Sequence, residues 1–123
     1  MGLGLALMVW LGAAGCATST GASAGVAYTK RGAETEVPGE VDAVEQRAQV
    51  ALHDQGITVA ASQTSPAAAE RVLEGMKGDV TVTVTITKTD DEAFTHVEVV
   101  AQKNPVEWDK DLARRIAQQI AAA

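Results

Sequence analysis

The sequence of 123 residues is poor in the side chains on which enzymes and metal proteins depend. It contains one cysteine, two histidines and four aromatic residues. A single cysteine excludes a disulfide within the chain. His53 and His96 are too few for the His and Cys ligand sets of zinc sites. We therefore expect no bound metal, no cofactor, no catalytic residue set and no enzyme activity.

Positive charge is also scarce. The chain has 10 Lys and Arg against 16 Asp and Glu, a net charge of −6. Binding of nucleic acid requires clustered Lys and Arg, and so does an electrostatic hold on anionic lipid. The charge balance therefore argues against both kinds of partner.

Long apolar runs are few, and the one at the N-terminus is short. Residues 3–14 contain no charged side chain and end at Gly15 and Cys16. A run of ~12 residues is too short to cross a hydrocarbon core as a helix, which takes about 20 residues. An apolar run of this length that ends in small residues is typical of a secretory signal.

The segment Leu11-Gly12-Ala13-Ala14-Gly15-Cys16 resembles the lipobox of bacterial lipoproteins. This resemblance implies cleavage between Gly15 and Cys16 and acylation of the Cys16 sulfur, which would attach the chain to a membrane. Ala17 stands where Asp is the usual signal for retention at the inner membrane. We therefore expect a lipid-anchored protein of the bacterial envelope, at the periplasmic face of the outer membrane. An uncleaved membrane anchor is the alternative.

The rest of the chain divides into two parts. After a signal peptide at residues 1–15, residues 16–27 are almost entirely Ala, Thr, Ser and Gly and predict a flexible tether. Residues 28–123 predict one small periplasmic domain.

Periodicity predicts the elements of that domain. Apolar residues at helical spacing predict a helix over 40–55, and clean alternation of Val or Ile with Thr predicts a strand over 79–88. A second helix is expected from Trp108, since Trp108, Leu112, Ile116 and Ile120 are spaced by four. Further strands are expected over 28–37, 57–61 and 94–102. Residues 66–77 are assigned to a strand, with a helix as the alternative.

This order, β-α-β-β-β-β-α, predicts an α+β fold: a two-layer sandwich whose mainly antiparallel sheet carries two helices on one face. The chain is also similar to a group of small bacterial lipoproteins with a domain of unknown function. The shared features are Gly56-Ile57-Thr58-Val59, Arg71-Val72-Leu73-Glu74-Gly75 and Trp108-Asp109-Lys110. The resemblance implies an extended segment at 71–75, and it implies location and fold without an activity.

Two functions are compatible with these features. The first is a structural or protein-interaction module with an envelope protein as partner. The second is a module that binds a small molecule or lipid, in a pocket of at least ~300 Å³ lined by Val84, Ile86, Leu112 and Ile116. We expect Trp108 to cap the core, and as an aromatic residue it is also a candidate partner contact. His96 and Glu98 should share a strand face, but a metal there would need a third ligand from another strand.

Overall fold

The computed structural model describes residues 25–64, 70–91 and 93–122. The predicted cleavage and lipidation sites, Gly15 and Cys16, lie outside these residues, as does the predicted tether up to residue 24. The structure therefore bears on the domain and not on its anchor.

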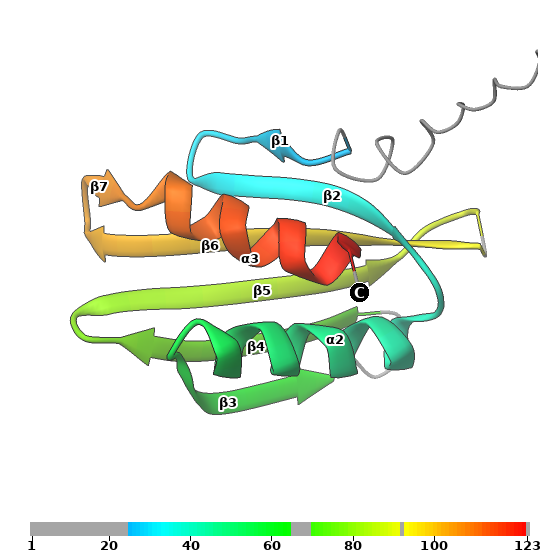
Figure 1. The fold of residues 1–123 in the computed structure, drawn as a ribbon, viewed down its shortest axis with the longest axis horizontal. Coiled ribbons are helices and arrows are strands. Elements are labelled where there is room, and N and C mark those ends of the chain that lie inside the picture. Colours follow the sequence, from blue (N-terminus) through cyan, green and yellow to red (C-terminus); the bar gives the residue numbers. More distant parts are fainter. Residues whose placement is uncertain (1–24, 65–69, 92, 123) are drawn as a thin grey trace, which may run out of the picture.

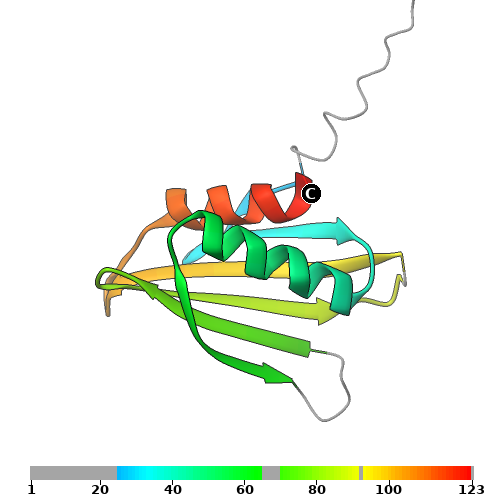
Figure 2. The same ribbon diagram turned by 60° about the horizontal axis from the view of Figure 1, so that its bottom comes forward.

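The described residues form an antiparallel sheet with two helices on one of its faces (Figures 1 and 2). The strands lie in the order β1-β2-β6-β5-β4-β3, with β7 paired to β6. This arrangement confirms the predicted two-layer α+β fold. The elements are β1 (Ala27–Tyr28), β2 (Gly32–Pro38), α2 (Val41–Asp54), β3 (Thr58–Thr64), β4 (Glu70–Lys77), β5 (Val80–Lys88), β6 (Phe94–Asn104), β7 (Glu107–Trp108) and α3 (Lys110–Ala122).

The first predicted strand is in fact two strands. Thr29 closes a tight turn between β1 and β2, because its hydroxyl accepts the backbone N–H groups of Arg31 (3.3 Å) and Gly32 (2.9 Å). Ala27, expected to be the last residue of the tether, pairs with Glu34 of β2. A local turn has thus replaced the continuous strand over 28–37.

The ambiguous segment is a strand where it is described. Residues 70–77 form β4, which pairs along its whole length with β5, so the helix alternative is wrong there. Residues 65–69 lie outside the described residues. Gly78, with a φ of +64°, makes the tight turn into β5. Pairing with a strand of strong β-propensity outweighs the local helix propensity of this segment.

The last helix begins two residues later than predicted, because Asp109 acts as its N-cap. The Asp109 carboxylate accepts the backbone N–H of Leu112 at 3.0 Å, and its own N–H donates to the carbonyl of Ala101 at 2.7 Å. Trp108 therefore belongs to β7, where it pairs with Gln102. The prediction that Trp108 starts the helical apolar stripe is wrong, and the stripe consists of Leu112, Ile116 and Ile120.

A single core lies between the helices and the sheet. The buried face of α2 consists of the five residues that its periodicity predicts: Val41, Val44, Ala48, Ala51 and Leu52. The apolar face of β5 packs against α2, and the matching face of β6 packs against α3. Their fully buried members are Val82, Val84, Ile86, Val97, Val99 and Ala101. The helices cover one side of the sheet only, which leaves its other side open.

Candidate interaction surface

One face of the sheet has no covering layer among the described residues. The alternation of β5 places Thr81, Thr83, Thr85 and Thr87 at its centre, each half-buried by its neighbours. The register of the ladders places side chains from β2, β4 and β6 beside them. We call this surface the open face; its other members are Glu34, Glu36, Glu70, Val72, Glu74, Met76, His96, Glu98, Val100 and Gln102.

The open face is acidic. Its charged side chains are five glutamates and one histidine, and none of its members is Lys or Arg. Glu34 and Glu98 stand directly opposite one another in adjacent strands. Like charges in such positions destabilise a sheet. The arrangement therefore costs the free domain some stability, and a positively charged partner would remove that cost.

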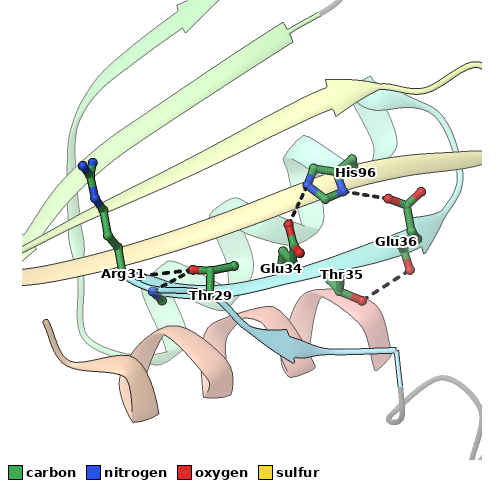
Figure 3. Close-up of polar contacts among 7 residues, drawn as sticks. Thr29, Arg31, Glu34, Thr35, Glu36 and His96 are labelled. Atoms are coloured by element: carbon green, nitrogen blue, oxygen red, sulfur yellow. Dashed lines mark hydrogen bonds and ion pairs between the residues drawn. The ribbon is translucent and has the colours of Figure 1, made fainter.

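His96 lies between two of these glutamates (Figure 3). Its Nδ1 is 2.6 Å from a carboxylate oxygen of Glu36, and its Nε2 is 3.4 Å from one of Glu34. Both ring nitrogens can donate to carboxylates only when the imidazole is protonated. A protonated His96 would therefore offset part of the negative charge of Glu34 and Glu36.

The structure brings His96 and Glu98 onto one face, as predicted, and adds Glu34 and Glu36, which were not predicted to lie there. A signal for them exists in the alternation of Ala33, Thr35 and Val37 with these two glutamates in β2. Within residues 25–64, 70–91 and 93–122, no three His, Cys, Asp or Glu side chains are arranged to hold a metal ion.

The remaining candidate residues lie elsewhere. His53 is at the end of α2, with its side chain 92% exposed. Trp108 is half-buried in β7 and is not part of the core cluster, so the expected core cap is not formed. It remains a candidate partner contact.

The expected ligand pocket between the layers is filled by side chains. Val84, Ile86, Leu112 and Ile116 are at most 2% exposed and belong to one continuous core. Hollows do occur at the surface, where other residues line them. One of about 390 Å³ lies between α2 and α3, against Ala43, Gln46, Arg47, Val50 and Gln119. A smaller one, of about 160 Å³, adjoins His96 and the two glutamates of β2.

The two edges of the sheet differ. At one end, β3 pairs with β4 only, among the described residues, and six of its seven residues are exposed. At the other end, β2 is partly covered by β1, whose Tyr28 hydroxyl donates to Asp111 of α3 at 3.1 Å. The guanidinium of Arg114 lies 5.6 Å from the centre of the Tyr28 ring, within the range of a cation–π contact.

Comparison with known protein families, with curated proteins and with solved structures finds no match for this chain. Neither of the two described helices is long and apolar enough to cross a membrane.

Proposed function

We propose that this protein is a lipid-anchored envelope protein that acts as a structural or protein-interaction module at the periplasmic face of the outer membrane. Acyl chains on Cys16 hold it to the membrane, and the domain from Ala27 onward contacts an envelope protein. The proposal assigns no catalytic role to the domain. The observation that carries it is the open face, a side of the sheet that no described element covers.

The anchor is supported by the sequence alone. The apolar run, the small residues and the single cysteine stand in the order of a lipobox, and residues 17–24 are small and uncharged. A spacer of ~10 residues between Cys16 and β1 spans roughly 17 Å, enough to hold the domain clear of the bilayer.

The interaction role is supported by the composition of the open face. Stiff β-branched side chains at its centre present a surface that loses little conformational entropy when a partner covers it. The five glutamates favour a partner with a positively charged surface, because complementary charge speeds association and excludes wrong partners. The ligand-binding alternative has less support, since the side chains named for its pocket are packed together in the core.

Crosslinking in intact cells followed by purification of the chain tests the interaction role. We expect a specific envelope protein to be captured by the wild type and lost, or captured several-fold less, with Glu34→Gln combined with Glu98→Gln. Asp79→Asn with Asp90→Asn is the matched control, because it removes the same charge from two exposed turn residues. Equal capture by both double variants would show that the open face is not the contact.

Labelling of cells with a clickable fatty acid tests the anchor separately. The wild type should take up the label and Cys16→Ser should not. A wild-type chain that stays unlabelled, or a Cys16→Ser chain that is labelled equally, would refute the lipid anchor. Neither result would affect the open face proposal.

A further inference from the structure

Apart from one irregularity of its register, the strand β3 lacks the devices by which proteins protect the edge of a sheet. Natural edge strands are usually short, carry charged residues or proline, or are covered by another element. The seven residues of β3 include no charge and no proline, and Val59 is 37% exposed. One irregularity, a register shift between Val59 and Ala61, leaves Ala61 to Thr64 in regular pairing with β4. No described strand pairs with the outer backbone groups of this stretch, which could therefore accept another strand.

The opposite edge carries those devices. There β2 contains Glu34 and Glu36 and ends at Pro38, and the strand beyond it, β1, has only two residues. The sheet of the described residues thus has one edge suited to pairing and one that is not. A contact between a β3 edge and a β2 edge would continue from copy to copy as an open filament, whereas a contact of β3 with another β3 closes after two.

We propose that β3 pairs with β3 of a second copy of this chain, so that two sheets join as one across a twofold axis. An antiparallel pairing of β3 with itself brings no like charges together, since all its side chains are uncharged. It also places Thr, Ser and Gln side chains opposite one another, where they can form hydrogen bonds across the strands. The open face of each copy remains exposed, because the strands join edge to edge.

Sedimentation of the full chain, in detergent with micelles in excess over protein, tests this pairing. The wild type should form a dimer, and Ser62→Lys or Gln63→Lys should weaken it by about tenfold or more, because each places two lysines close to the axis. Both positions are exposed, so neither change should lower the melting temperature of the monomer. Ala27→Lys, an exposed residue on the opposite edge, is the matched control and should leave the dimer intact.

Three results would overturn the proposal. The first is a wild type that stays monomeric over the whole accessible concentration range. The second is a dimer that both β3 variants leave unchanged, since the contact would then lie elsewhere. The third is a monomer that crosslinks to a different protein through β3, which would mean that an extended segment of that protein occupies the edge. None of these results depends on the Glu34 and Glu98 variants, so failure here is distinguishable from failure of the open face proposal.

Discussion

The two edges of the sheet are held by different contacts. The β2 edge is fixed from outside, by β1, by the Tyr28–Asp111 hydrogen bond and by α3 packed over β2 and β6. The β3 edge is held by its pairing with β4 on one side and by the buried side chain of Ile57, the residue that precedes the strand. Amides of an exposed edge open more readily than those of a covered strand. We infer that the domain has a stable half around β2, β6 and α3 and a looser margin at β3.

The largest effect should follow from damage to the stable half. Ile116→Asp removes a fully buried side chain of α3 and places a charge in the core. The lost burial costs roughly 1.5–3 kcal/mol and the buried charge several more, against a total stability of about 5–15 kcal/mol. Urea denaturation should show that the cooperative transition is lost or nearly so. Arg115→Asp, at the neighbouring exposed position, should unfold much as the wild type does, and an equal loss there would contradict the layer assignment.

Substitution of one glycine near each edge, Gly32 in β2 and Gly75 in β4, tests how firmly each edge is held. A Cβ on Gly32 would lie 1.9 Å from the carbonyl oxygen of Val99, in the middle of the sheet, whereas one on Gly75 would lie 2.4 Å from that of Thr58, in β3. Val99 is held on both sides, but β3 can move outward. We expect Gly32→Ala to cost about 3 kcal/mol of global stability and Gly75→Ala about 1 kcal/mol.

Hydrogen exchange distinguishes a local loss of stability at β3 from a loss of stability across the whole sheet. Gly75→Ala should speed exchange of the β3 amides while those of β2 and β6 stay protected, and Gly32→Ala should speed exchange across the sheet. Gly78→Ala is the control for loss of glycine itself, because a Cβ there meets nothing within 4 Å and its cost comes from the φ of +64°. A Gly75→Ala variant that loses protection everywhere would show that β3 is not a separate margin.

This difference between the edges could not be foreseen from the sequence, although much of the fold could. The buried positions of α2 and the alternation of β5 depend on neighbours within a few residues, so their periodicity is visible in the chain. Strand order and register depend on pairing across the sheet. For that reason the contact of His96 with Glu34 and Glu36, and the place of β3 at an edge, appear only in the structure. Trp108 was misplaced because the capping role of Asp109 outweighs the spacing of the apolar residues.

An ion pair on the β3 side gives a smaller effect. Arg71 of β4 has its side chain 13% exposed and contacts Asp42 at 2.6 Å and Glu45 at 3.2 Å, both on α2. Arg71→Met should cost about 1–3 kcal/mol, because it leaves the mostly buried Glu45 without this partner. Asp42→Asn, which changes an exposed carboxylate, should cost less than about 1 kcal/mol. If urea denaturation gave equal losses for the two variants, the buried part of the network would not be the important one.

The smallest effect should come from loss of the hydrogen bond that joins Tyr28 of β1 to Asp111 of α3. Tyr28→Phe removes the hydroxyl that donates to Asp111 and keeps the ring that lies near Arg114. Because the side chain is half exposed, the lost hydrogen bond should change global stability by no more than about 0.5 kcal/mol. Exchange of the β1 amides should nevertheless become faster, since this bond joins a two-residue strand to α3. Tyr28→Ala removes the ring as well and should free β1 further. If Tyr28→Phe instead lowered global stability by as much as Arg71→Met, the β1 side would be the weaker margin and the comparison of the two edges would be reversed.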